Sequence, residues 1–200
     1  MSGPLRALLL AAGAGQRYGR LKQLEQLAGE SLVRRTARTV LAAGLPLDVV
    51  IGAEAPRLRA ELQDLPLTLI ENPDWSQGMG GSIACAVRRM PADDPSALLL
   101  LLADQALLRS DDLRALIQAH RKFPDTILAA DYGGQTLGPP CRFPRAMRDE
   151  LQALSGERGA RGLLRAHAQR VQSLPMPHAG FDIDVPADLA RAAAVLAIAP

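Results

Sequence analysis

The chain alternates short apolar runs with longer segments whose charges recur at helical spacing, and this alternation restricts its fold more than any other feature. The apolar runs, typical of strands buried on both faces, are Leu5–Ala11, Leu47–Ile51, Leu67–Ile70, Ala97–Leu102 and Thr126–Ala130. The segments with helical spacing are Ser31–Ala43, Ala55–Leu62, Gly81–Met90 and Ser110–Lys122. Such alternation predicts an α/β fold in which helices cover both faces of a mostly parallel sheet.

The last third of the chain breaks this rhythm. A Gly- and Pro-rich stretch at Tyr132–Phe143 precedes a predicted helix at Arg145–Leu154 and a predicted strand-then-helix unit at Phe181–Ala197. We expect this part to be α+β in character.

Composition bounds the remaining possibilities. The 200 residues are 48% hydrophobic and 22% charged, which predicts one domain over residues 1–200. The formal net charge of +2, from 23 basic and 21 acidic residues spread along the chain, argues against nucleic acid or a membrane surface as a partner. Cys85 and Cys141 lack the spacing of a zinc site or a disulfide framework. Because no signal peptide or membrane span is recognised, we expect a cytoplasmic protein.

A glycine-rich turn follows the first predicted strand. The stretch from Leu10 to Gly15 leads into a segment that carries Arg17, Arg20 and Lys22. Backbone N–H groups at glycines can approach an anion closely, and the three cations can neutralise it, so the turn predicts a triphosphate site. The dinucleotide fingerprint fails because Tyr18 replaces its third glycine, and the P-loop pattern fails at the spacing before the lysine. For this loop alone, a surface turn with solvated charges is the alternative.

An acidic residue, Asp104, follows the apolar run that ends at Leu102. Ligands of open parallel sheets bind beyond the carboxyl ends of the strands, so Asp104 and the glycine-rich turn should emerge at one edge. One or two carboxylates plus substrate phosphates are the usual ligands of Mg²⁺. The alternative role for Asp104 is a helix cap, but Ser110 is better placed to cap the next helix.

A second acidic pair lies near the C-terminus. Asp182 and Asp184 are two positions apart, so on a strand both would point at one cation. Asp188 falls in the first turn of a helix that Pro186 begins, where a negative charge suits the helix dipole. A merely local role for Asp184 at the start of that helix is an open alternative.

The polar stretch Asn72–Ile83 contains Trp75, the one tryptophan of the chain. Ser82 at a helix start offers a hydroxyl and backbone N–H groups to a ligand, which favours base or ribose recognition. The other interpretation is that Ser82 only caps the helix and Trp75 anchors the loop. Residue spacing does not separate the two.

Taken in order, these segments resemble the MobA-like nucleotidyltransferase superfamily, and within it the molybdenum cofactor cytidylyltransferases, over nearly the whole chain. The motif LAAGxSxRMGxxK corresponds to Leu10–Lys22, with Gly15 for Ser and Tyr18 for Met. NPxWxxGMGxS corresponds to Asn72–Ser82, and LADQP to Leu102–Ala106. The motifs GHPxxF, SGDxGAR and DIDTPEDL correspond to Gly138–Phe143, Ser155–Arg161 and Asp182–Leu189. The chain departs from these motifs at Ala106 for Pro, Pro139 for His, Glu157 for Asp and Val185 for Thr.

The resemblance implies a three-layer, Rossmann-like nucleotidyltransferase fold and assigns the site. Arg17 and Lys22 would bind the triphosphate, and Asp104 would hold Mg²⁺, which makes these three the catalytic residues. Asp184, with Asp182, would complete the metal site. The nucleotide would be bound by Leu10, Ala11, Ala12, Gly13, Ala14, Gly15, Gly80 and Ser82. Gly138, Pro140 and Arg161 would face the acceptor.

The segment Leu10–Gly13 reads LAAG, whereas guanylyl-transferring relatives have LAGG. This difference favours CTP over GTP. The resemblance therefore predicts transfer of CMP from CTP to the phosphate of molybdenum-bearing molybdopterin, with a recipient molybdoenzyme as a further partner. One alternative is the same chemistry with GTP, or with a sugar or alcohol phosphate as acceptor. Another is a non-catalytic carrier of the cofactor, to which Tyr18, Ala106 and Pro139 would point. Retention of the lysine and both metal-binding carboxylates argues against the carrier.

Overall fold

The computed structural model describes residues 3–15, 18–134, 136–157 and 159–198. At its centre lies a seven-stranded sheet with the order β5-β4-β1-β6-β8-β7-β9. Its strands are β1 (Leu5–Leu10), β4 (Leu47–Ile51), β5 (Thr68–Glu71), β6 (Ala97–Leu102), β7 (Ile127–Asp131), β8 (Leu137–Phe143) and β9 (Val171–Pro175). Neighbouring strands are parallel except where β8 meets β6 and β7. The predicted mostly parallel sheet is confirmed.

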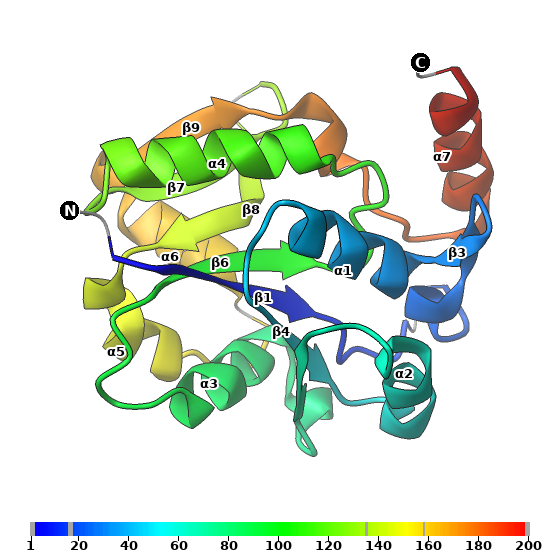
Figure 1. The fold of residues 1–200 in the computed structure, drawn as a ribbon, viewed down its shortest axis with the longest axis horizontal. Helices are drawn as coiled ribbons and strands as arrows, with labels where there is room; N and C mark the ends of the chain where they lie inside the picture. The colour runs from blue at the N-terminus through cyan, green and yellow to red at the C-terminus, as the bar shows by residue number, and fades with distance from the viewer. Residues whose placement is uncertain (1–2, 16–17, 135, 158, 199–200) are drawn as a thin grey trace.

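Helices cover both faces of the sheet, with α1 and α4 in front of it in Figure 1. One face carries α1 (Leu32–Ala42), α2 (Ala55–Leu62) and α4 (Ser110–Lys122); the other carries α3 (Met79–Arg89), α5 (Arg148–Gln152) and α6 (Ala160–Ala166). Successive side chains of a strand point to opposite faces, so Leu9 joins the core with α1 while Leu8 joins the core with α3. The predicted three layers are confirmed.

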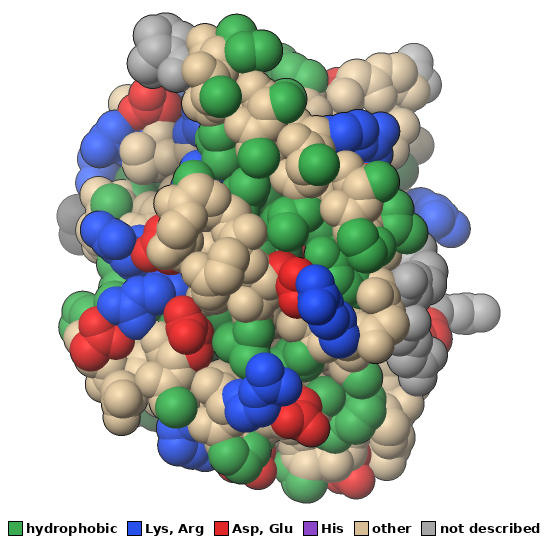
Figure 2. Space-filling model, turned by 90° about the vertical axis from the view of Figure 1, so that its right-hand side faces the viewer, with side chains coloured by type: hydrophobic (Ala, Val, Ile, Leu, Met, Phe, Trp, Pro, Cys, Tyr) green, Lys and Arg blue, Asp and Glu red, His purple; other side chains and the backbone are tan. Residues whose placement is uncertain are grey.

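Smaller elements complete the chain. A hairpin of β2 (Gln26–Leu27) and β3 (Glu30–Ser31) precedes α1. Short 3-10 helices lie at Lys22–Leu24, Trp75–Gln77, Arg145–Met147, Ala168–Arg170 and Pro177–Gly180. The last helix, α7 (Pro186–Ile198), stands at one end of the molecule. Its Val195 and Ile198 are exposed. Figure 2 views the molecule from the right-hand side of Figure 1, where α7 stands. Among the described helices, none is long and apolar enough to cross a membrane.

The sequence prediction missed β8, where Pro139 and Pro140 suggested only a break. A proline has no N–H to donate, so it is rare in a strand with neighbours on both sides. Here the pairing of β7 with β8 jumps from Ala129↔Cys141 to Ala130↔Gly138, so that a bulge takes up both prolines. The elements α6 and β9 were also missed.

Two local predictions near the sheet edge were wrong. The strand expected at Phe181 is reduced to an isolated bridge between Gln105 and Asp182. Helix α4 starts at Ser110, but its cap is Arg109, whose backbone N–H donates to the Asp112 carboxylate at 2.9 Å. An acid in the first turn thus replaces the expected serine cap.

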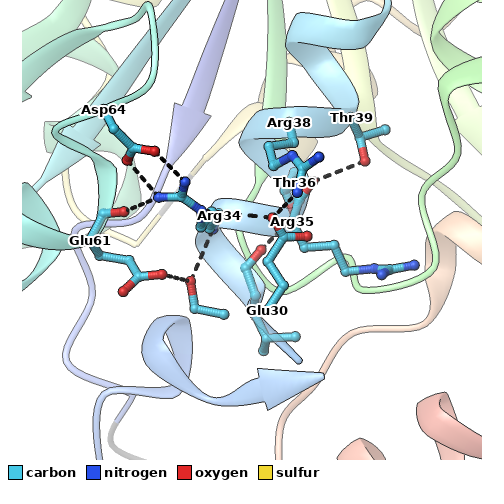
Figure 3. A network of polar contacts seen from close by, with 10 residues as sticks. Glu30, Arg34, Arg35, Thr36, Arg38, Thr39, Glu61 and Asp64 are labelled. Atoms are coloured by element: carbon cyan, nitrogen blue, oxygen red, sulfur yellow. Dashed lines mark hydrogen bonds and ion pairs between the residues drawn. The ribbon is translucent and has the colours of Figure 1, made fainter. Parts of the chain in front are cut away.

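A polar network on α1 joins this helix to its neighbours (Figure 3). Arg34 donates to the Asp64 carboxylate and to the Glu61 carbonyl oxygen, each at 2.7 Å, which ties α1 to the end of α2. The guanidinium of Arg34 lowers the pKa of Asp64 to about 2. On the same helix, Arg35 Nε donates to the Ala106 carbonyl oxygen at 3.1 Å. Helix α1 therefore also supports the loop that follows β6.

Candidate functional site

The glycine-rich turn and Asp104 emerge together because β1 and β6 are adjacent parallel strands. Leu10 lies opposite Leu102 at the ends of the two strands, and the Ala103 N–H donates to the Leu10 carbonyl oxygen at 3.2 Å. The chain after β1 and the chain after β6 therefore start from the same edge, as predicted.

At this edge the Lys22 ammonium group meets two carboxylates. Its Nζ lies 2.6 Å from Asp104 Oδ2 and 3.2 Å from Asp184 Oδ1, and it also donates to the Ile183 carbonyl oxygen at 2.9 Å. The lysine and Asp104 side chains are mostly buried, whereas that of Asp184 is 36% exposed. The structure thus brings together three residues that the sequence placed in one site.

Two opposing effects act on the pKa of Lys22. Burial lowers this pKa, but the negative charges of Asp104 and Asp184 outweigh burial and raise it above its ordinary value of 10.5. A lysine whose pKa is raised on folding stabilises the folded state at all lower pH values and loses that effect only as the pH rises beyond 10.5. The ammonium is therefore charged at neutral pH.

The buried amide of Gln105 holds the two acidic segments beside each other, a role that the sequence did not reveal. Its Nε2 donates to the carbonyl oxygens of Pro139 at 2.6 Å and Ala179 at 2.7 Å. On the backbone, the Ile183 N–H donates to the Asp104 carbonyl oxygen at 3.1 Å. The segment that carries Asp184 is thereby fixed against the end of β6.

Asp182 lies close to this cluster without completing it. Burial raises its pKa to about 7, and the nearby charges of Asp104 and Asp184 add to the effect. Its Oδ1 is buried and has no hydrogen-bond partner within the described part of the chain. No three His, Cys, Asp or Glu side chains within the described ranges form a group that could hold a metal ion. The predicted set of three carboxylates is thus not grouped among the described residues: Asp182 forms a bridge to Gln105, whereas Asp184 lies outside any strand pairing.

A cavity of about 390 Å³ opens beside the cluster. Its lining includes Lys22, Asp104 and Asp184 together with these predicted nucleotide-binding residues: Leu10, Ala12, Gly13, Ala14, Gly15 and Ser82. Ala11 and Gly80 are not in the lining. The side chain of Ala11 is buried in the core, and the Gly80 N–H donates to the Gly156 carbonyl oxygen at 2.8 Å.

The glycine-rich turn is held from within by Gln23, which the sequence reasoning passed over. Its Nε2 donates to the carbonyl oxygens of Gly13 at 2.6 Å and Ala11 at 3.2 Å. Gly15 has φ +67°, and a Cβ there would lie 2.3 Å from the Arg20 carbonyl oxygen, so this conformation of the turn requires glycine.

Arg20, another predicted cation of the turn, is engaged by a neighbouring carboxylate. The guanidinium of Arg20 pairs with the Glu25 carboxylate at 2.6 Å and does not line the cavity. Arg17 lies outside the described residues.

The residues expected to face the acceptor lie on β8 and α6 and do not line this cavity. Gly138 packs on the Tyr132 ring, Pro140 is buried in β8, and Arg161 is exposed on α6. The charge of Arg161 lowers the pKa of Asp182 against the stronger effect of burial, which shows that the two lie within electrostatic range. Their role toward an acceptor stays a prediction.

The far wall of the cavity is formed by Glu157 and the residues around Met79. The sequence identified the segment of Glu157 as a motif on the acceptor side but did not single out Glu157 itself. Chemically, the cavity combines a backbone turn, one ammonium and two converging carboxylates at one edge, which suits a polyanion accompanied by a hard cation.

Comparisons with known proteins show the family of the chain. The family described as "MobA-like NTP transferase domain" matches residues 7–171. Nicotine blue oxidoreductase of Paenarthrobacter nicotinovorans is 34% identical over 167 residues, which cover 79% of this chain and 80% of that protein. Purine catabolism protein PucB of Bacillus subtilis is 28% identical over 170 residues, 81% of each chain.

Solved structures share the fold. Rv0371c of Mycobacterium tuberculosis superposes with a TM-score of 0.83 at 24% identity over 97% of this chain and 99% of that one. The same protein in complex with manganese superposes with a TM-score of 0.78 at 23% identity, over 96% of this chain and 98% of that one. Molybdopterin-guanine dinucleotide biosynthesis protein A of Archaeoglobus fulgidus superposes with a TM-score of 0.69 at 19% identity, over 96% of this chain and 99% of that one.

Proposed function

Since the chain belongs to the MobA-like family of nucleotidyltransferases, we propose that it transfers CMP from CTP to the phosphate of molybdenum-bearing molybdopterin and releases pyrophosphate. The observation that carries this proposal is the convergence of Lys22, Asp104 and Asp184 beside the glycine-rich turn. A structural neighbour named for molybdopterin-guanine dinucleotide biosynthesis supports the class of acceptor.

The residues present fit a divalent cation, for which we propose Mg²⁺. Asp104 and Asp184 already direct carboxylate oxygens at one cationic group, the Lys22 ammonium, and hard cations take such oxygen ligands together with substrate phosphates. A related fold has been solved with manganese. When bound, the cation would neutralise charge that develops on the pyrophosphate leaving group.

The protein's own groups would position the reactants. The backbone from Gly13 to Gly15 lines the cavity and would hold the phosphates through N–H groups, while Gln23 keeps the turn in shape. Lys22 would bind the triphosphate as a charged ammonium. The acceptor phosphate attacks the α-phosphorus in line without a covalent enzyme intermediate, so positioning and electrostatics supply the rate enhancement.

The preference for CTP has a steric basis. Ala12, which lines the cavity, stands where LAGG relatives have a glycine. Its methyl group narrows the cavity and thereby favours a pyrimidine over the larger guanine. A molybdoenzyme that receives the product would be the further partner, and we expect the reaction to take place in the cytoplasm.

The test is pyrophosphate release by the purified protein with Mg²⁺ and molybdenum-loaded molybdopterin, run in parallel with CTP and with GTP. Release with CTP alone supports the proposal, and release with GTP alone moves the protein to guanylyl transfer. No release with either nucleotide, despite cofactor binding, favours the carrier or a different acceptor, and a parallel assay with a sugar phosphate and an alcohol phosphate separates these two.

A further inference from the structure

The wall of the cavity contributed by the C-terminal half carries a carboxylate, Glu157, that the mechanism above does not use. Glu157 lines the cavity with Trp75, Ser76 and Met79. Its side chain is exposed and makes no hydrogen bond or ion pair with any residue that the structure describes. The carboxylate is therefore available to a bound ligand.

The position of Glu157 is fixed by close contact between two segments far apart in the sequence. The Gly80 N–H donates to the Gly156 carbonyl oxygen at 2.8 Å. Gly78 has φ +103°, and a Cβ on it would lie 2.5 Å from the Gly156 carbonyl. A Cβ on Gly159 would lie 2.6 Å from Met79 Sδ. Because these contacts leave no room for side chains, Glu157 is held against the start of α3.

Charge decides which part of a nucleotide can face Glu157. The ion pairs of Lys22 go to Asp104 and Asp184, so this ammonium does not neutralise Glu157. A carboxylate that no described cation neutralises repels phosphates, which leaves the uncharged nucleoside as its ligand. Ribose presents two neighbouring hydroxyl donors that match the two oxygens of a carboxylate, whereas cytosine has a single amino group to donate.

We propose that Glu157 accepts hydrogen bonds from the 2′ and 3′ hydroxyls of the nucleotide and so selects ribonucleotides over deoxyribonucleotides. This inference rests on the proposed function, because it takes the ligand to be a nucleoside triphosphate. A hydrogen bond from a hydroxyl to a carboxylate is stronger than one between two neutral groups. Loss of this hydrogen bond weakens nucleotide binding by about tenfold.

The experiment uses Trp75 as an internal probe, since it is the one tryptophan of the chain and lines the cavity. Its fluorescence is titrated with CTP, 2′-deoxy-CTP, 3′-deoxy-CTP and UTP in the presence of Mg²⁺, and calorimetry checks the affinities. Glu157→Ala is compared with the wild type and with Asp93→Ala, a matched control. Asp93 is an exposed acid that precedes β6 and therefore lies at the opposite end of that strand from Asp104.

We expect the wild type and Asp93→Ala to bind CTP about tenfold more tightly than either deoxynucleotide. In Glu157→Ala the ratio should fall to about one, with the CTP-to-UTP ratio unchanged. An unchanged ribose preference in Glu157→Ala overturns the inference, and a loss of the CTP-to-UTP preference assigns the carboxylate to the base instead. If the wild type binds no nucleoside triphosphate, the proposed function itself fails and this inference fails with it.

Discussion

Replacing Lys22 with methionine removes the ammonium group on which Asp104 and Asp184 converge but keeps a side chain of similar length. The two carboxylates then lose the ammonium nitrogen that both approach to within 3.2 Å in the wild type. Breaking a fully buried ion pair costs about 3–5 kcal/mol, whereas an exposed pair contributes less than about 1 kcal/mol. The side chains of Lys22, Asp104 and Asp184 are 15%, 17% and 36% exposed, so this site lies between the two limits.

We therefore expect Lys22→Met to lower the free energy of unfolding by about 2 kcal/mol at neutral pH. For a chain of this size the melting temperature should fall by about 4–8 °C. The loss comes from repulsion between two carboxylates, and either a proton or a divalent cation relieves that repulsion. The loss of stability of Lys22→Met relative to the wild type should therefore be smaller at pH 5 than at pH 8. At pH 8 it should also be smaller when Mg²⁺ is added.

Thermal melts followed by circular dichroism test this prediction at both pH values, with and without Mg²⁺. Arg59→Met is the control, because it removes a cation from an ion pair with Glu71 at 2.9 Å in which both side chains are more than half exposed. Its melting temperature should change by less than about 2 °C and should not respond to Mg²⁺. A Lys22→Met deficit that is the same at both pH values and insensitive to Mg²⁺ would refute the reasoning.

Three further predictions concern the same site and its support. Asp104→Asn should lower pyrophosphate release by orders of magnitude without unfolding the protein, and near-normal turnover would show that the metal assignment is wrong. Asp182, whose folded pKa of about 7 exceeds its ordinary 3.8, takes up a proton on folding, so it lowers stability progressively as the pH rises from about 4 to 7. In metal-free melts, Asp182→Asn should therefore gain stability relative to the wild type at pH 8 but not at pH 4, and a gain of equal size at both would contradict the assigned pKa. Gly78→Ala should lower the free energy of unfolding by about 2 kcal/mol or more, because φ is +103° at Gly78 and the added Cβ would clash with Gly156. Gly162→Ala, which adds a Cβ in open space on α6, should raise the free energy of unfolding by about 0.5–1 kcal/mol. Denaturant unfolding of both variants measures the difference, and similar effects would argue against the close contact.

Apart from the short hairpin of β2 and β3, the sequence alone determined the first two thirds of the fold. There, strands buried on both faces and amphipathic helices each leave a local periodic pattern, so β1, β4, β5, β6 and β7 were predicted close to their observed bounds. Since the carboxyl ends of parallel strands share an edge, the placement of Asp104 beside the glycine-rich turn also followed from the sequence. By contrast, β8 and β9 were missed, because prolines in a bulge and a short strand leave no such pattern.

Only the tertiary structure decided how the site residues meet. Lys22 and Asp104 are 82 residues apart, and no local pattern encodes the 2.6 Å contact between them. The same is true of Glu157, which reaches the cavity because Gly78, Gly80 and Gly156 let two distant segments touch. Spacing alone placed Asp182 beside Asp184 on one strand face, but backbone pairing with Gln105 leaves its Oδ1 buried and unpartnered among the described residues. Periodicity along the chain records which face of an element is buried, whereas contacts between elements depend on packing in three dimensions.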